Sequence, residues 1–296
     1  MLPPVLPFAA GEPLHRDGKC VDGSTVGWSS CVASTFLGVG GVKRVAVLAD
    51  VHGNLHALEA VLAEPDVASA DLIVFNGDLA DGPFPRETME RIEALGPKGV
   101  WLRGNGDRWI VEARAGRFRH PDPSTDALIH WAAGRLSEAQ VARLAALPMR
   151  TTVDIENGRV ALCHATARSD NEMLLVDSTI GQARAAFQGI DAGLVVVGHS
   201  HMPFDRLFDR RRVVNAGSVG LPYGHSGASW ALLGPDPVLR RTSYDARAAA
   251  DAIVASGMPG ALDFAETCIL TVESDAAALD AFRTTLERQQ RDADFG

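Results

Sequence analysis

Short apolar runs alternate with stretches of helical spacing along the chain from residue 42 onward. Apolar runs of this length are typical of strands that are buried on both faces inside an α/β sheet. The segments that predict strands lie at 44–49, 71–75, 100–102, 194–197, 213–214, 229–233 and 238–243. A hairpin with strands at 151–156 and 159–163 is also expected, because Asn157-Gly158 between them is the strongest short signal for a hairpin turn.

Apolar residues that recur every three or four positions predict helices between these strands. One helix is expected directly after Asn54, whose side chain can cap its first turn. Others are expected at 87–95, within 113–147, at 179–187 and in the C-terminal region. The last helix of the 113–147 segment begins with a capping box formed by Ser137 and Gln140. This alternation of strands and helices predicts an α/β fold.

Residues 1–41 differ from the rest of the chain. They are rich in Gly, Pro, Ser and Val and show no sustained period. We expect them to form a disordered extension. A second interpretation is that they are not part of the native protein, because Val42 can be encoded by an alternative bacterial start codon. The intact mass of the native protein tests the second interpretation. From 42 to 296 the sequence contains no repeat and no linker, which predicts a single domain with a helical C-terminal region.

The composition of the chain restricts which partners the protein can bind and which cellular compartment it occupies. The chain has 296 residues and a net charge of −9, which disfavours a nucleic-acid partner because phosphate neutralisation requires basic surfaces. None of its four cysteines has C-x-x-C spacing, which is typical of a reducing compartment. No run has the length of a membrane span. These features predict a soluble, cytoplasmic protein without a membrane partner, and they leave the oligomeric state open.

Polar residues that bind metals follow five of the predicted strands. Each has an ordinary alternative, such as a loop cap for Asp78 or a left-handed turn for Asn105. Sites in open α/β sheets form outside the carboxyl ends of strands, where all these side chains would meet. Together they are Asp50, His52, Asp78, Asn105, His164, His199 and His201. We expect Asp50 and His52 to converge because side chains two positions apart on an extended chain point the same way. Such ligands suit Mn²⁺, Fe or Zn²⁺.

Five short motifs carry a resemblance to a known family. They are Asp50-Val51-His52, Gly77-Asp78, Gly104-Asn105, His164 and Gly198-His199-Ser200-His201, in this order. This series resembles the signature blocks of the calcineurin-like metallophosphoesterases. The longer strings 50–54 and 215–220 resemble the small prokaryotic phosphodiesterase branch, some of whose members are described as diadenosine-tetraphosphatase-like. The resemblance covers about residues 44–245.

The resemblance implies a four-layer α/β/β/α sandwich of two mixed sheets flanked by helices, with two divalent ions. Mn²⁺ is the first choice, and Fe, Zn²⁺ and Ni²⁺ are alternatives. It implies that one ion is held by Asp50, His52 and His201. The other would be held by Asn105, His164 and His199, with Asp78 bridging both. Asn54 and Asn105 are expected to face the substrate. The implied activity is hydrolysis of small phosphodiesters or phosphomonoesters, including nucleotide-derived ones, through a hydroxide between the ions.

One position departs from the family pattern. In much of the superfamily the third block reads Gly-Asn-His, and its histidine helps the leaving oxygen depart. Here Gly106 stands at that place, and glycine cannot donate a proton. His225 is our substitute candidate, with an exposed loop histidine as the alternative. Gly106 also keeps a second function open, namely a metal-binding scaffold of the same fold with weak or no catalysis.

Overall fold

The computed structural model describes residues 42–294, so the expectations for residues 1–41 lie outside the described part of the chain. The strands form two mixed five-stranded sheets, and this confirms the expected fold class. In spatial order, the first sheet contains β10 (Val238–Thr242), β9 (Ala228–Leu233), β1 (Val45–Leu48), β2 (Leu72–Asn76) and β3 (Gly99–Leu102). The second contains β4 (Arg150–Ile155), β5 (Gly158–Cys163), β6 (Leu194–Val197), β8 (Arg211–Asn215) and β7 (Phe204–Phe208).

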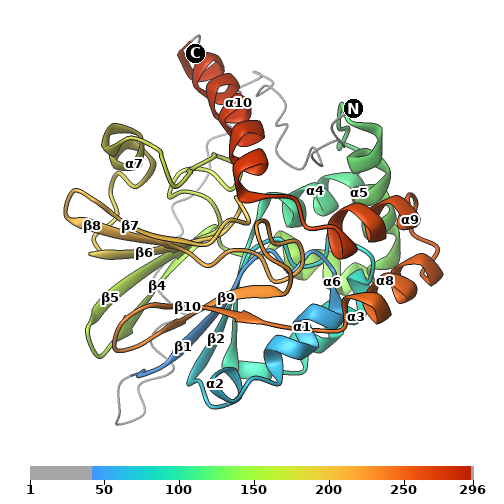
Figure 1. Cartoon of the computed structure of the whole chain (residues 1–296), viewed down its shortest axis with the longest axis horizontal. Coiled ribbons are helices and arrows are strands. Elements are labelled where there is room, and N and C mark those ends of the chain that lie inside the picture. Colours follow the sequence, from blue (N-terminus) through green and yellow to red (C-terminus); the bar gives the residue numbers. More distant parts are fainter. Residues whose placement is uncertain (1–41, 295–296) are drawn as a thin grey trace, which may run out of the picture.

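Helices cover the outer faces of both sheets (Figure 1). Those on the first sheet's side include α1 (Leu55–Leu62), α2 (Pro65–Ala68), α3 (Pro85–Glu93), η2 (Gly96–Lys98), α4 (Asn105–Arg114), α5 (Pro123–Arg135) and α6 (Glu138–Ala145). Helix α7 (Ile180–Ala186) covers the second sheet. The C-terminal region is helical, as expected, with α8 (Ala246–Ala255), α9 (Ala261–Phe264), η3 (Ala265–Leu270) and α10 (Asp275–Asp294).

The position of strand β1 between two hydrophobic cores explains why its apolar run is unbroken. Val45 and Val47 pack in the core between the two sheets, against residues such as Val196 of β6. Ala46 and Leu48 point the other way, into the core between the first sheet and its helices. Successive strand residues face opposite sides, so a strand that separates two cores must be apolar at every position.

The carboxyl ends of the central strands meet at one end of the molecule. Strands β1, β2 and β3 are parallel to one another, and so are β5, β6 and β8. The loops after these strands are joined directly, because the main-chain N–H of His199 donates to the Asp50 carboxylate at 2.9 Å. The sheets therefore bring residues far apart in sequence to one place.

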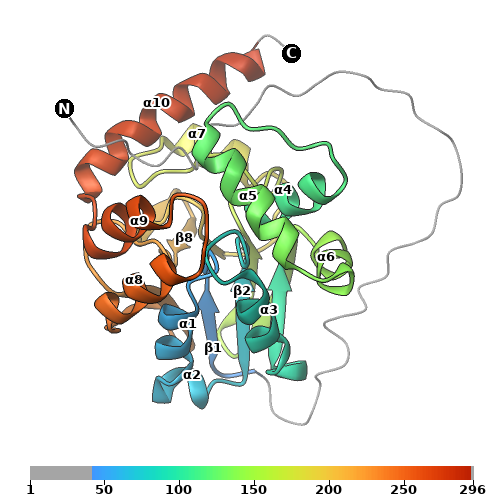
Figure 2. The ribbon, with the colours of Figure 1, turned by 90° about the vertical axis from the view of Figure 1, so that its right-hand side faces the viewer.

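Helix α10 runs across this end of the molecule (Figure 2). Its Ala278 and Phe282 pack with Met173, Leu175 and Met202, which belong to the loops that follow β5 and β6. No helix among residues 42–294 is long and apolar enough to span a membrane.

The expected helices within 113–147 are present, and the segment contains parts of three of them. The first, α4, already begins at Asn105, so the alternative of a left-handed turn at this residue does not hold. Two other local features differ from expectation. Strand β7 was not expected, since it is an edge strand whose apolar ends flank three mixed residues. Asp50 and His52 do not lie on extended backbone, because both have positive φ angles, 55° and 47°.

Candidate metal centre

Backbone strain is concentrated at the predicted ligands. The structure describes six non-glycine residues with positive φ, and five of them are Asp50, His52, Asp78, His199 and His201. Residues other than glycine rarely adopt positive φ angles, and each one that does lowers the stability of the fold by about 1–3 kcal/mol. The surrounding loops enforce it: Asp50 N–H donates to Gly77 O at 3.0 Å and His52 N–H to Asp78 O at 2.9 Å. Strain of this kind is typical of functional sites.

One group of side chains contains Asp50, His52 and His201, all buried. Nε2 of His201 lies 3.2 Å from Oδ1 of Asp50, and Nε2 of His52 lies 3.8 Å from the same oxygen. The two imidazole Nε2 atoms are 2.9 Å apart. Three ligand-type atoms thus converge on one point.

A second group contains Asp78, His164 and His199. Nε2 of His164 lies 3.3 Å from Oδ2 of Asp78 and 3.8 Å from Oδ1 of Asp50, so the two groups adjoin. Asn105 lies beside the second group, since a terminal atom of its side-chain amide is 3.3 Å from Nε2 of His164. The structure therefore brings all seven predicted side chains together, and their role as ligands stays a prediction.

Hydrogen bonds fix which nitrogen of three histidines faces the centre. The Nδ1 atoms of His52, His164 and His201 lie 2.9, 2.8 and 2.8 Å from Asp81 Oδ2, Asn76 O and Leu221 O, respectively. Each Nδ1–H therefore donates outward, and Nε2, which faces the centre, has a free lone pair when the ring is neutral. Outer hydrogen bonds of this type orient metal-binding histidines.

The charges of the cluster favour a cation. Burial disfavours the ionised form of Asp50 and Asp78, but nearby imidazoles outweigh it and lower the pKa of both carboxyls. Burial likewise disfavours protonated histidine, yet the surrounding carboxylates raise the pKa of His52 to about 9 and that of His164 to about 10. His199 differs, because burial and the neighbouring His164 lower its pKa to about 4. The carboxylates thus favour protons on His52 and His164, and a bound metal ion would have to displace these protons.

The residues present fit divalent metal ions. The terminal amide atom of Asn105 that faces the centre is 3.0 Å from Nδ1 of His199 and 3.1 Å from the main-chain oxygen of Asp170. If this atom is the oxygen, acceptors face acceptors, an arrangement that a cation between them stabilises. The donor set of carboxylate, amide and imidazole groups without thiolates suits Mn²⁺, Fe or Zn²⁺.

Two buried aspartates support the cluster from outside. The Asp107 carboxylate accepts from the main-chain N–H groups of Asp78, Leu79 and Gly104, so it holds two ligand loops together. Burial and the carboxylates of Asp78 and Asp81 raise the pKa of Asp107 to about 8. Sequence reasoning missed Asp81, which is grouped with His52 and Asp78. Its spacing three residues after Asp78, beside Gly82, was the available signal.

Two other residues that we expected to take part in the reaction differ in burial. Asn54 is buried and caps α1 by accepting from the Ala57 N–H at 3.1 Å, while its amide group donates to Gly220 O. These bonds assign it a structural part, and its contact with substrate stays a prediction. His225 lies in an exposed loop, and its role as proton donor also stays a prediction.

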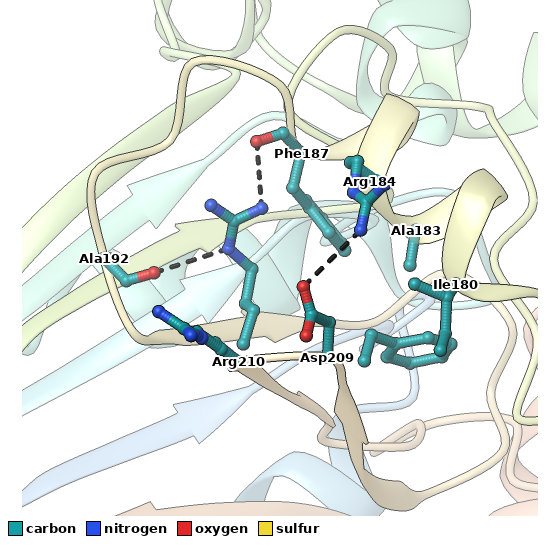
Figure 3. Close-up of a pocket in the computed structure, with 9 residues that line it drawn as sticks. Ile180, Ala183, Arg184, Phe187, Ala192, Asp209 and Arg210 are labelled. Atoms are coloured by element: carbon teal, nitrogen blue, oxygen red, sulfur yellow. Dashed lines mark hydrogen bonds and ion pairs between the residues drawn. The ribbon is translucent and has the colours of Figure 1, made fainter.

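A cavity of about 220 Å³ lies between α7 and the turn that joins β7 to β8 (Figure 3). Strand β8 begins beside the cavity at Arg211 and ends beside the ligand loops at Asn215. The cavity therefore lies at the opposite end of the strands from the ligand cluster. Arg184 lies 3.5 Å from the Asp209 carboxylate. The Arg211 guanidinium donates to three main-chain carbonyls, those of Phe187, Ile190 and Ala192. These cations therefore already have partners.

An α/β sandwich of two mixed sheets with clustered Asp, Asn and His at its strand ends defines the metallophosphoesterase class. A model of the calcineurin-like phosphoesterase superfamily domain matches residues 44–236, and the chain belongs to this superfamily.

Three relatives illustrate the likeness. An uncharacterized protein of Methanocaldococcus jannaschii is 27% identical over 239 residues, which cover 73% of this chain and 94% of that protein. The crystal structure of a metallophosphoesterase from Sphaerobacter thermophilus is 27% identical, with a TM-score of 0.61 and coverage of 75% of this chain and 97% of that one. A hypothetical protein from Pyrococcus horikoshii OT3 shares the fold, with 22% identity, a TM-score of 0.66 and the same coverage of 75% and 97%.

Proposed function

We propose that the protein is a dinuclear metal-dependent phosphoesterase that hydrolyses small phosphodiesters or phosphomonoesters, nucleotide-derived esters among them. The observation that carries the proposal is the convergence of two adjoining buried ligand groups at the strand ends. Membership of the phosphoesterase superfamily supports hydrolysis as the type of reaction. The substrate would be a small molecule rather than nucleic acid, in keeping with the net charge of −9.

Each ligand has a proposed place. Asp50, His52 and His201 would hold one ion, and Asn105, His164 and His199 would hold the other. Asp78 lies between the groups, with His52 Nε2 at 3.9 Å and His164 Nε2 at 3.3 Å from its Oδ2, and would serve both ions. Divalent ions bound here would lower the pKa of a bound water molecule and neutralise charge on the phosphoryl oxygens. Mn²⁺ is the proposed metal.

The chain's own residues shape the environment of that reaction. Asn105 is a neutral ligand, so it adds no negative charge on the side that an anionic substrate approaches. It is also the first residue of α4, where the main-chain N–H groups of a helix favour anions. The Gly106 N–H donates to Oδ1 of Asp78 at 2.7 Å and thereby directs the other oxygen, Oδ2, toward the histidines.

Hydrolysis of bis-nitrophenyl phosphate with added Mn²⁺ tests the proposal. We expect the native sequence to be active and Asp78→Ala to lose more than about 100-fold in rate, because removal of a bridging ligand exceeds the usual 10–100-fold effect of outer residues. Asp66→Ala is the matched control, since Asp66 forms ion pairs with Arg44 and Arg240 at the surface.

A metal-binding scaffold without catalysis is the second candidate, and Gly106 is the observation that favours it. Absence of hydrolysis across nitrophenyl and nucleotide esters, together with tight binding of metal, would establish the scaffold instead. The buried ligand set argues for catalysis, because a scaffold does not need ligands for two adjoining ions.

A further inference from the structure

Asp170 lies in the loop that follows β5 and is paired with two arginines. Its side chain is 7% exposed, whereas those of Arg103 and Arg108 are 25% and 30% exposed. Arg108 approaches the carboxylate with two nitrogens, Nε at 3.1 Å from Oδ2 and Nη2 at 3.1 Å from Oδ1. Arg103 Nε lies 3.2 Å from Oδ2. A two-pronged arginine pair of this kind is directional as well as strong.

The two arginines lie on either side of Asn105 in the sequence. Arg103 directly follows β3, and Arg108 lies in α4, three residues after Asn105. Residues three apart share a face of a helix, so Arg108 lies on the same face of α4 as Asn105. The main-chain oxygen of Asp170 also lies 3.1 Å from a terminal amide atom of Asn105. Asp170 thus contacts Asn105 itself and binds, through its carboxylate, two arginines that flank Asn105 in the sequence.

The same contacts join two loops that carry ligands of one ion. Asn105 follows β3, the edge strand of the first sheet, and His164 follows β5 of the second sheet. Because β3 has a neighbouring strand on one side alone, sheet pairing constrains the loop after it less than the loops after inner strands. The contacts of Asp170 with Arg103 and Arg108 supply a further constraint on this loop, in addition to the hydrogen bonds of Asp107 and Gly106.

We propose that Asp170 is a positioning residue for the second metal ion, and that it acts by holding Asn105 at its ligand position through Arg103 and Arg108. The proposal rests on the dinuclear centre proposed above. The Asn105 amide is the weakest metal ligand of the second group, so its binding to the ion depends on how the side chain is oriented. Outer partners of ligands typically change metal affinity by about 10–100-fold.

Titration of the metal-free protein with Mn²⁺, followed by calorimetry and by electron paramagnetic resonance, tests this role. For Asp170→Ala we expect the second ion to bind at least about tenfold more weakly and the first to bind nearly unchanged. The spectrum of two coupled Mn²⁺ ions should give way to that of an isolated ion at the same metal concentration. A merely structural role would weaken both ions equally or neither.

The matched control is Asp177→Ala, in the same loop. Asp177 also pairs with an arginine, Arg283, with Nη2 at 2.6 Å, but its side chain is 41% exposed and it is grouped with no ligand. We expect unchanged binding of both ions. Arg108→Met, which keeps the aliphatic stem, should reproduce part of the Asp170→Ala loss, because Arg103 still pairs with Asp170. The double variant should be no weaker than Asp170→Ala alone.

The outcomes separate the two proposals. If the native sequence binds fewer than two ions, the dinuclear centre itself is wrong. If it binds two, and Asp170→Ala and Arg108→Met bind both with native affinities, the positioning role alone is overturned. Thermal unfolding of the metal-free variants shows whether each is folded, and the partly exposed Arg108 gives a test even if Asp170→Ala does not fold.

Discussion

The carboxylate of Asp81 lies 2.9 Å from Nδ1 of His52, and both side chains are buried. The other oxygen of Asp81, Oδ1, has no hydrogen-bond partner among residues 42–294. Burial raises the pKa of the Asp81 carboxyl, although the neighbouring imidazole opposes this effect. Asp81 therefore sits in an unfavourable place for a carboxylate and makes one strong contact there, which orients a predicted ligand.

Removal of this contact should weaken binding of metal. For Asp81→Ala we expect an affinity for Mn²⁺ lower by about 10–100-fold, because His52 loses the bond that directs its Nε2 inward. Asp81→Asn should lose less, since its amide oxygen still accepts from Nδ1–H. Metal titration of the two variants measures the difference. Equal affinities for the native sequence and both variants would show that the bond has no part in metal binding.

Asp81 also explains why residue 106 is a glycine. A Cβ atom added there would lie 2.1 Å from Oδ2 of Asp81, closer than any real contact allows. We expect Gly106→Ala to lower the free energy of unfolding by about 1–3 kcal/mol, the usual cost of overpacking, and to lower activity because Asp81 must move. Denaturant unfolding and the nitrophenyl assay measure both effects.

Gly134→Ala is the control for this prediction. Gly134 lies in α5, and an added Cβ there would meet nothing within 4 Å. Alanine is favoured over glycine inside a helix by roughly 0.5–1 kcal/mol, so this variant should be slightly more stable than the native sequence. A Gly106→Ala protein as stable as Gly134→Ala would contradict the steric argument.

The order of strands predicted the α/β class and the gathering of the seven side chains, whereas the two-sheet sandwich was implied by the resemblance to the calcineurin-like metallophosphoesterases. Parallel strands end at one edge, so polar residues at strand ends meet whatever the loops do. The sequence did not predict how the ligands are held. Asp50 and His52 converge through left-handed backbone, a conformation that few non-glycine residues adopt. Asp81 was missed because it lies within a loop, and its contact with His52 joins residues 29 positions apart.

Leaving-group dependence tests the consequence of Gly106 for the proposed reaction. Without a histidine at this position to protonate the leaving oxygen, the rate should fall steeply as the pKa of the leaving group rises. Aryl and nucleotide esters should therefore react faster than alkyl esters. A series of substituted aryl and alkyl phosphodiesters measures the slope. Similar rates for nitrophenyl and simple alkyl diesters would mean that another group, such as His225, donates the proton.

Far from the centre, Asp71 should make stability depend on pH. Its carboxylate accepts from the main-chain N–H groups of Arg44 at 2.9 Å and Lys43 at 2.8 Å, and these bonds lower its pKa from the ordinary value of 3.8. A pKa that is lower in the folded state stabilises the protein above the unfolded value and ceases to do so as pH falls through the folded one. Asp71→Ala should therefore unfold more easily at about pH 6, and the difference should shrink toward about pH 3.

Denaturant unfolding of both proteins at these two pH values measures the effect. Asp154→Ala is the control, because Asp154 pairs with Arg159 at the surface with side chains 70% and 51% exposed. Surface pairs of this kind contribute little, so its loss at neutral pH should be smaller than that of Asp71→Ala. A difference between Asp71→Ala and the native sequence that is constant with pH would show that the bonds act without the charge.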